Sequence, residues 1–485
     1  VSDGMGVQSM TLARQFYQYE LLGNSKSAMI DDISSTLPLD SLLVGSVRTK
    51  PFGQLVTDSA AAATALASGV KTLNSYLGVD KNKKPVANVM EAAKHGKGYL
   101  TGLVATSRIT HATPGGWSAH ILERDWENQV AAQQIGENVL GRSVDLMLGG
   151  GLRHFIPKSA KGSDREDERD LIKEATEKYG FKTVVKNRDE LLAAKGSGKA
   201  LPILGLFAKS HLDFEIDRNK TDQPSIGEMS HSALSMLAEA SSTCDSPGFF
   251  IMIEGSRIDS CGHANDIACH VREIIAYQDA VAIVKSFAEQ HPNTMVVSTS
   301  DHETGGVSLG TQLDELRDSS DYYDWHRTSA KASGEVVAKK LLKAADTEDL
   351  PALVRKLVAN DLGVTDVSQA EVDAILKARA GQGKTEEDIT EHAVNRLIST
   401  RGLIGWTSWG HTGMDVNLYA INAPHLRGNL DNTYLAKYTG EYLGVWGETM
   451  DKLSRRLAKQ KIDKEEPAVA PAESGNKRSS GHFHH

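Results

Sequence analysis

Residues 294–306 read TMVVSTSDHETGG and join a strand pattern to two side chains that can bind a metal. The segment 294–300 is short, rich in β-branched residues and followed by glycines, so it predicts a buried strand. Asp301 and His302 then stand where that strand ends, the place at which open α/β sheets bind ligands. Their oxygen and nitrogen donors suit zinc or a similar divalent ion. The alternative is a capping Asp beside a surface His.

A second predicted strand ends in the same chemistry. The apolar run 249–253 is followed by Glu254, Asp259 and His263 within ten residues. The apolar neighbours of these three side chains indicate a partly buried segment. A buried carboxylate without a partner is costly, so these side chains need a cation.

Two further segments carry the same residue types. Asp3 precedes a glycine-flanked turn and a helical pattern over 10–17, where it could also be a helix N-cap. His411 precedes a strand-like run at 416–420. Four segments that begin or end at Asp, Glu or His favour one shared metal cluster over four unrelated surface features.

Strand-like runs alternate with helical patterns through much of the chain. Strands are predicted at 100–106, 144–148 and 203–207, and helices at 125–140 and 224–240. This alternation predicts an α/β fold, a three-layer α/β/α sandwich with a central, mostly parallel sheet.

Two stretches interrupt the alternation. Residues 158–200 are highly charged and are predicted to be a solvated helical excursion. Residues 310–400 are rich in Ala, Leu, Lys and Glu and predict a helical insertion that shapes the mouth of a site or a subunit contact. We expect one domain over 1–463 and a disordered tail with a tag remnant over 464–485. The opening residues, 1–4, resemble the end of a strand whose beginning lies upstream.

Bulk composition excludes some functions. The net charge of −9, from 54 basic and 63 acidic residues, leaves no basic footprint for nucleic acid. The sequence contains no apolar run of about 18 residues, so no membrane span is predicted. The three cysteines, 244, 261 and 269, have no zinc-finger spacing, and a Cys261–Cys269 disulfide fits the sequence as well as free thiols do.

A candidate nucleophile precedes a run of alanines. Ser59 stands before Ala60 to Ala63, a strong helix signal, and Gly69 is a plausible helix stop. A capping serine is the common interpretation. The same position would also place the hydroxyl among free N–H groups that stabilise an alkoxide and an arriving phosphate. No Gly-x-Ser-x-Gly elbow surrounds Ser59, which argues against an α/β-hydrolase esterase.

Arg124 is a candidate for phosphate binding. It follows His111, Thr113 and Pro114 in a segment that otherwise predicts a loop and a helix start. A surface arginine is the simpler interpretation. A guanidinium is, however, the group best matched to a pair of phosphoryl oxygens.

Taken in order, these segments resemble the alkaline phosphatase family, and the fungal vacuolar branch in particular. The resemblance spans nearly the whole chain, from residue 3 to about 420. It is carried by Asp3 to Gly6, Val56 to Ala60, Ala112 to Pro114, His120 to Arg124, Glu254 to His263, Thr299 to His302 and His411 to Gly413.

The resemblance implies two zinc ions, one magnesium ion and a role for each motif residue. It assigns a first zinc to Asp259, His263 and His411, a second to Asp3, Asp301 and His302, and magnesium to Asp3, Thr113 and Glu254. The second zinc would also bind the oxygen of Ser59. Ser59 would be phosphorylated, and Arg124, oriented by Asp58, would hold two phosphate oxygens.

Two positions depart from the best-known bacterial pattern. His111 replaces an Asp beside the magnesium site, as in animal-type and some marine bacterial relatives, and Ser260 replaces a Lys near the phosphate. We expect weaker magnesium binding, a requirement for added magnesium, and easier phosphate release.

The expected activity is hydrolysis of small phosphate monoesters by a homodimer in the vacuolar lumen, the secretory pathway or the extracellular space. Alternatives are a phosphodiesterase, a sulfatase or a phosphoglycerate mutase of the same superfamily, or a non-catalytic phosphate-binding scaffold. The Arg124 clamp favours monoesters, and Ser59 lacks the Cys/Ser-x-Pro-x-Arg context of a sulfatase. The intact set of ligand residues argues against a scaffold.

Overall fold

A computed structural model describes residues 1–24, 32, 34–243, 246–311, 330–345, 348–381 and 386–460. The predicted tail at 464–485, Cys244 and part of the predicted insertion lie outside the described residues.

Five parallel strands form one sheet, in the order β4-β5-β3-β2-β6. Their bounds are β2 Leu100–Arg108, β3 Leu146–Gly150, β4 Thr183–Val185, β5 Ile203–Leu206 and β6 Phe249–Glu254. The strands predicted near residues 100, 144, 203 and 249 are confirmed, and so is the parallel sheet.

The prediction for 158–200 was partly wrong. The stretch does contain two short helices, α7 (Leu171–Glu177) and α8 (Arg188–Ala194), but β4 lies between them and pairs with β5. A strand of three residues is too short to show a periodic pattern, and the charged residues around it conceal the one buried position, Val185.

Four further strands form a second, mixed sheet, in the order β13-β1-β12-β7. Strands β1 (Leu43–Arg48) and β13 (Gly428–Asp431) are parallel, whereas β12 (Val416–Ile421) is antiparallel to β1 and to β7 (Val296–Thr299). The strands predicted at 294–300 and 416–420 are confirmed as β7 and β12. They pair antiparallel, however, whereas a mostly parallel sheet was predicted.

The N-terminal residues join the two sheets. Ser2 forms parallel bridges to Gly255, which follows β6, and to Ser300, which follows β7. The Ser2 N–H donates to Thr299 O at 3.1 Å, and the Asp3 N–H donates to Gly255 O at 3.2 Å. The carboxyl ends of β6 and β7 are therefore neighbours, with Asp3 between them.

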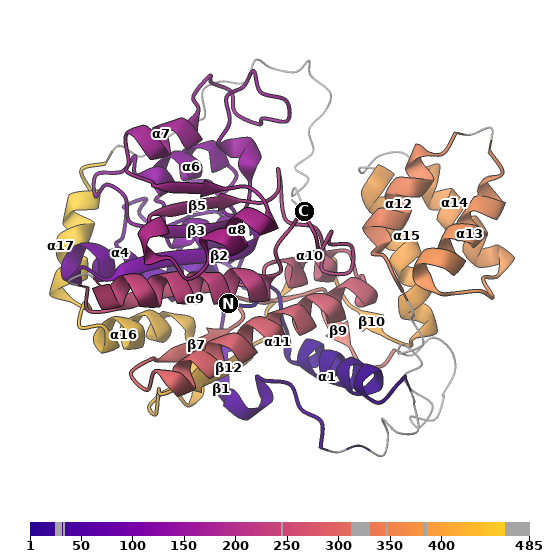
Figure 1. Cartoon of the computed structure of the whole chain (residues 1–485). Coiled ribbons are helices and arrows are strands. Elements are labelled where there is room, and N and C mark those ends of the chain that lie inside the picture. The colour runs from indigo at the N-terminus through magenta and orange to yellow at the C-terminus, as the bar shows by residue number, and fades with distance from the viewer. Residues whose placement is uncertain are drawn as a thin grey trace.

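Helices cover both faces of the sheet, as alternate residues of β2 show. Leu103 and Ala105 belong to one buried apolar cluster, whereas Val104 belongs to another. The first cluster includes residues of α3 (Ser59–Ser68), α4 (Val89–Ala92), α6 (Glu127–Ile135), α16 (Asn432–Tyr442) and α17 (Glu448–Leu457). The second cluster includes residues of α1 (Val7–Leu21), α9 (Ile226–Thr243) and α11 (Ile267–Gln290). Figure 1 shows α9 and α11 lying across one face. The three-layer α/β fold is confirmed.

Helices of the predicted insertion lie to one side of the sheets (Figure 1). They are α12 (Gly334–Lys343), α13 (Leu350–Leu362), α14 (Gln369–Arg379) and α15 (Glu386–Arg401). Their core includes Leu12 and Phe16 of α1 and Ile267 and Val271 of α11, so the insertion packs on these two helices. A single domain over 1–463 stays a prediction.

A buried carboxyl group on α11 makes stability depend on pH. Glu273 accepts a hydrogen bond from the Glu215 N–H at 2.6 Å, and burial raises the pKa of Glu273 to about 7. A raised carboxyl pKa stabilises the fold at acid pH, and this contribution is lost as the pH rises through about 7. We expect Glu273→Gln to exceed the parent in unfolding free energy by up to about 3 kcal/mol near pH 8.5 and to match it near pH 5.

Urea unfolding at both pH values measures this difference. Asp189→Asn, at a side chain that is 87% exposed, is the matched control and should show no pH-dependent difference. An equal effect of Glu273→Gln at both pH values would contradict the prediction.

Candidate active site

Ser59 is the first residue of α3, and the residue before it caps the helix. Asp58 is the N-cap, and its Oδ1 accepts from the Ala61 N–H at 2.8 Å. Gly69 ends the helix in the left-handed region, as predicted. The interpretation of Ser59 as the cap is thus wrong. The buried Ser59 hydroxyl instead lies with Oγ 3.0 Å from His302 Nε2.

Asp259, His302 and His411 form one group of ligand atoms that lie within 4.8 Å of one another. His263 joins them, with Nε2 3.1 Å from His411 Nε2 and 3.4 Å from Asp259 Oδ1. The other ring nitrogens of His263 and His411 face the carbonyl oxygens of Trp409 (2.6 Å) and Thr57 (2.9 Å). Since each Nδ1–H donates to a carbonyl, both Nε2 lone pairs face each other, an arrangement that calls for a cation.

Asp3, Asp301 and His302 form a second group, which shares His302 with the first. His302 Nε2 lies 3.2 Å from Asp301 Oδ2 and 3.6 Å from Asp3 Oδ1. Within the described residues, neither oxygen of Asp3 nor Oδ2 of Asp301 accepts a hydrogen bond, although all three are buried. Such oxygens are costly unless a cation binds them.

The third predicted ligand set consists of oxygen donors. In the described part of the chain, Thr113 Oγ1 and both carboxylate oxygens of Glu254 are buried without a hydrogen-bond partner. Burial, and then the charge of Asp301, raises the pKa of Asp3 well above its usual value, with Glu254 also contributing. Burial likewise raises the pKa values of Glu254 and Asp301 to about 7. Four carboxylates packed in this way, Asp259 included, favour a bound cation, and an oxygen-only set suits magnesium.

Arg124 extends from the segment after α5 (Ala112–Gly116) toward the head of α3. Its Nη1 lies 3.4 Å from Asp58 Oδ2, which also accepts from the Ser75 N–H at 2.8 Å. Its Nη2 lies 3.1 Å from His111 Nε2. Burial holds the pKa of His111 well below its usual value, so this ring is neutral and accepts from the guanidinium. The placement of His111 beside a magnesium site stays a prediction, and the structure adds its contacts with Arg124 and with the ring of His211.

Thr304 is a site residue that the sequence did not predict. Its hydroxyl donates to Asp259 Oδ1 at 2.5 Å and lies 3.2 Å from His302 Nδ1, so it orients one residue of each ligand group. The only signal in the sequence was a Thr two positions after a predicted ligand. Ser260, which was predicted to lie near the phosphate, is a buried residue of α10 (Arg257–His263).

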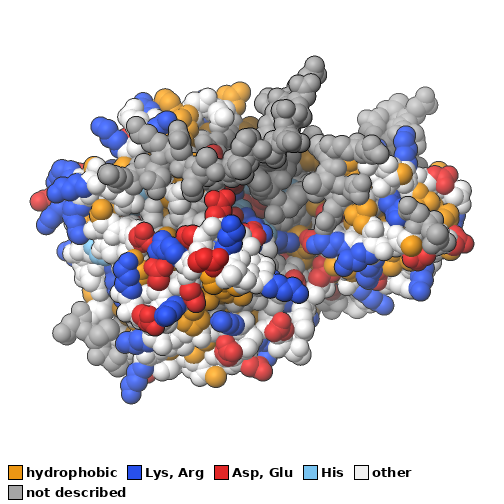
Figure 2. Space-filling view, turned by 90° about the horizontal axis from the view of Figure 1, so that it is seen from above, with side chains coloured by type: hydrophobic (Ala, Val, Ile, Leu, Met, Phe, Trp, Pro, Cys, Tyr) orange, Lys and Arg blue, Asp and Glu red, His pale blue; other side chains and the backbone are white. Residues whose placement is uncertain are grey.

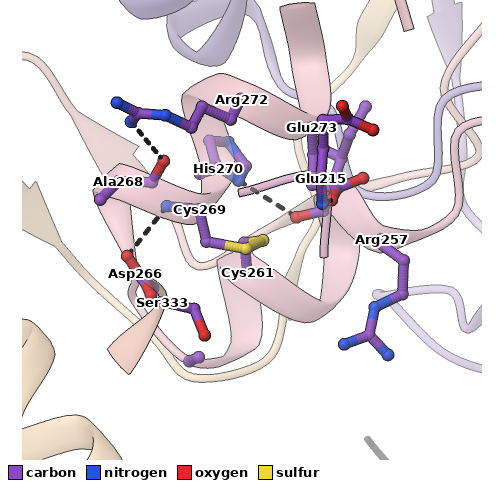
Figure 3. Close-up of a disulfide and its surroundings, with 12 residues drawn as sticks. Glu215, Arg257, Cys261, Asp266, Ala268, Cys269, His270, Arg272, Glu273 and Ser333 are labelled. Atoms are coloured by element: carbon purple, nitrogen blue, oxygen red, sulfur yellow. Dashed lines mark hydrogen bonds between the residues drawn. A yellow bond between two sulfur atoms is a disulfide. The ribbon is translucent and has the colours of Figure 1, made fainter. Parts of the chain in front are cut away.

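Cys261 and Cys269 form a disulfide, which settles the open alternatives for this pair. The bond joins α10 to α11, and both residues are buried (Figure 3). Cys261 stands between Asp259 and His263 on α10, so the bridge holds the helix that carries two candidate ligands.

Removal of this disulfide should loosen α10. The bridged cysteines are eight residues apart, and a closed loop of this length contributes about 2–3 kcal/mol. We expect the double variant Cys261→Ser/Cys269→Ser to lose about that much unfolding free energy and to release bound metal to a chelator faster than the parent. Cys244→Ser is the control, and equal metal release by all three proteins would contradict the prediction.

A sequence profile described as "Alkaline phosphatase" matches residues 1–444. The chain belongs to the alkaline phosphatase family. It is 40% identical to the repressible alkaline phosphatase of Saccharomyces cerevisiae, over 91% of this chain and 80% of that protein. It is 38% identical to alkaline phosphatase 3 of Bacillus subtilis, over 90% of this chain and 86% of that protein. A cold-active alkaline phosphatase from Shewanella sp. superposes with a TM-score of 0.73 at 30% identity, covering 91% of this chain and 98% of that one.

This alkaline phosphatase is therefore a phosphomonoester hydrolase of a metal-dependent family. These relatives favour the phosphatase over the sister activities and the non-catalytic scaffold. No helix among the described residues is long and apolar enough to cross a membrane.

Proposed function

We propose that this alkaline phosphatase hydrolyses small phosphate monoesters through a phosphoserine at Ser59, with two zinc ions and one magnesium ion. One observation supports this most strongly. Ser59 Oγ lies 3.0 Å from His302 Nε2, and His302 belongs to both groups of candidate ligands. The hydroxyl is thus placed where two cations would be held.

The donor types fit the three ions. Asp259, His263 and His411 would hold the first zinc, Asp3, Asp301 and His302 the second, and Asp3, Thr113 and Glu254 the magnesium. Zinc accepts mixed nitrogen and oxygen ligands, whereas magnesium prefers oxygen. When bound, the ions lower the pKa of a coordinated hydroxyl and stabilise negative charge on the departing oxygen.

Ser59 and Arg124 perform the first half of the reaction. The free N–H groups at the start of α3 favour an anionic oxygen and an arriving phosphate. The Ser59 hydroxyl gives up its proton as its oxygen attacks phosphorus in line and forms a new bond to it. The bond from phosphorus to the alcohol oxygen breaks, and the departing oxygen takes up one proton, through solvent, and leaves as the alcohol. Arg124 binds two phosphoryl oxygens, and its hydrogen bond to Asp58 keeps the guanidinium at the head of the helix.

A water molecule completes the cycle. It attacks phosphorus of the phosphoserine, the bond to the Ser59 oxygen breaks, and phosphate leaves while the hydroxyl is restored. Ser260 supplies no charge to hold the product, which favours its release.

Vacuolar or secretory location and a homodimer belong to the same proposal. The buried Cys261–Cys269 disulfide supports an oxidising compartment. Figure 2 shows Lys and Arg interspersed with Asp and Glu on the face it displays. Such mixing is typical of a surface that does not attract nucleic acid by charge, and the absence of a nucleic-acid partner stays a prediction.

Hydrolysis of p-nitrophenyl phosphate at alkaline pH tests the proposal. Chelator-stripped protein is assayed alone, with zinc, and with zinc plus magnesium, beside the bis-ester and the sulfate. We expect zinc to restore monoester turnover, magnesium to raise it further, and both other substrates to react far more slowly. Equal turnover of the bis-ester would assign the chain to a sister activity, and full activity without added magnesium would refute the third ion.

A further inference from the structure

A histidine and a glutamate form a fully buried pair beside the segment that carries Arg124. His120 Nε2 lies 2.9 Å from Glu91 Oε1, and both side chains are 0% exposed. Glu91 belongs to α4, and His120 stands four positions before Arg124. A buried ion pair is often no more stabilising than well-packed apolar side chains, so a fixed geometry is what it contributes.

The polar atoms of both side chains have partners. His120 Nδ1 lies 2.7 Å from Gly78 O, which can only accept, so Nδ1 carries a proton. His120 Nε2 faces a carboxylate oxygen, so a second proton lies between His120 and Glu91. Burial alone would lower the pKa of His120, but the charge and the hydrogen bond of Glu91 raise it above its usual value. Glu91 Oε2 accepts from the Asn88 N–H at 3.1 Å, so turning either side chain would break a buried hydrogen bond.

The backbone of His120 is held as firmly as its ring. The His120 N–H donates to Gln133 Oε1 at 2.9 Å, and the His120 carbonyl oxygen accepts from Gln133 Nε2 at 3.3 Å. Gln133 belongs to α6, so His120 is joined to α4 by its ring and to α6 by its backbone.

Two segments of chain meet at His120. Residue Ile121 forms an antiparallel bridge with Leu77, through two hydrogen bonds of 2.9 Å. Gly78 has a φ of +58°, and a Cβ on it would lie 2.7 Å from His120 Nδ1, so only glycine allows this close approach. The segment before Arg124 is therefore fixed against the segment that contains Leu77 and Gly78.

The second of these segments also holds the partner of Arg124. The Ser75 N–H donates at 2.8 Å to Asp58 Oδ2, the oxygen that lies 3.4 Å from Arg124 Nη1. Asn74 Oδ1 accepts from the Asp58 N–H at 3.1 Å. A shift at His120 would thus move both the start of the Arg124 segment and the chain that holds the Asp58 carboxylate.

We propose that Glu91 and His120 are positioning residues for Arg124, whose guanidinium they place to receive two phosphoryl oxygens. This inference rests on the phosphate-binding role proposed above for Arg124. Both residues act through the two segments that meet at His120 and not by contact with substrate. A displacement of about 1 Å is enough to cost about 100-fold in rate, so a buried pair at this distance affects how well phosphate is held.

Variants of Glu91 test the proposal, with binding of inorganic phosphate to the metal-loaded protein as the readout. Glu91→Leu removes the partner of His120, and Glu91→Asp keeps the charge but shortens its reach. We expect phosphate to bind about tenfold more weakly to Glu91→Leu and about threefold more weakly to Glu91→Asp. KM for p-nitrophenyl phosphate should rise in parallel, and the metal content should match the parent.

A conservative variant should preserve the geometry. In Glu91→Gln the amide N–H can donate to Nε2 of a neutral His120 while the amide oxygen still accepts from Asn88, so phosphate binding should stay within about twofold of the parent. Asp145→Asn is the control for the loss of a buried charge. Asp145 bonds to Lys94 and directly precedes β3, at the amino end of the sheet, so this variant should bind phosphate as the parent does.

Double variants with Arg124→Ala separate positioning from a general loss of structure. Residues that act through Arg124 have nothing to position in its absence. In that background, Glu91→Leu and Glu91→Asp should therefore change phosphate binding by less than about twofold.

Each outcome bears on one of the two proposals. Equal losses with and without Arg124, or phosphate binding equal to the parent's in the Glu91 variants, would overturn the positioning role. Glu91→Asp decides the matter if Glu91→Leu does not fold. Phosphate binding by Arg124→Ala equal to the parent's would instead refute the phosphate-binding role of Arg124, and the positioning role with it.

Discussion

Ser59→Ala is expected to lower kcat for p-nitrophenyl phosphate by at least about 10⁴-fold. The variant removes the oxygen that would form the covalent intermediate, 3.0 Å from His302 Nε2. The helix should be retained, because alanine is the best helix former and Asp58 still caps α3. Turnover is measured together with zinc content and the thermal midpoint, which should both match the parent.

Ser68→Ala is the matched control on the same helix. This buried serine donates to Thr64 O at 2.7 Å, far from the head of α3, so its kcat should stay within a few-fold of the parent. Acid quenching during turnover should trap a phosphoryl group on Ser59 in the parent and in Ser68→Ala. A phosphoryl group on another residue, or turnover by Ser59→Ala within about tenfold of the parent, would refute Ser59 as the nucleophile.

Chelation is expected to remove more than about 99% of the activity and to lower the thermal midpoint. Stripping the ions would leave Asp3, Asp301, Asp259 and Glu254 buried beside one another with several oxygens unpaired. Anything that binds the native state alone stabilises it, so both losses should reverse together when zinc and magnesium are returned. Metal analysis, calorimetry and turnover on the same samples measure this coupling.

Asp301→Asn tests the same point at one ligand. It should bind fewer zinc ions per chain and lose at least about 100-fold in kcat after metals are returned. Asp40→Asn is its control, because the Asp40 carboxylate bonds to Arg14 and should not affect zinc content. Full activity of the chelated parent, confirmed free of metal, would exclude the metal-dependent mechanism.

The local elements could be predicted where a pattern was long or repeated. The alanine run predicted α3, and apolar runs predicted β2 and β6. The residues after β6 predicted a metal site. Each predicted ligand lies at or near the end of its element, because local composition determines where a strand stops and which side chain follows. The three-residue β4 and the orienting hydroxyl of Thr304 escaped prediction, since neither carries a periodic signal.

By itself, the sequence determined the α/β class, the strand ends that carry Asp, Glu and His, the helix that presents Ser59, and the family resemblance. These depend on local patterns and on motif order. Only the tertiary structure decided that His302 is shared by two ligand groups, that Cys261 pairs with Cys269, and that Ser2 joins two sheets. Those features depend on which strands and helices become neighbours, and contacts between residues 297 and 298 positions apart leave no periodic trace in a single sequence.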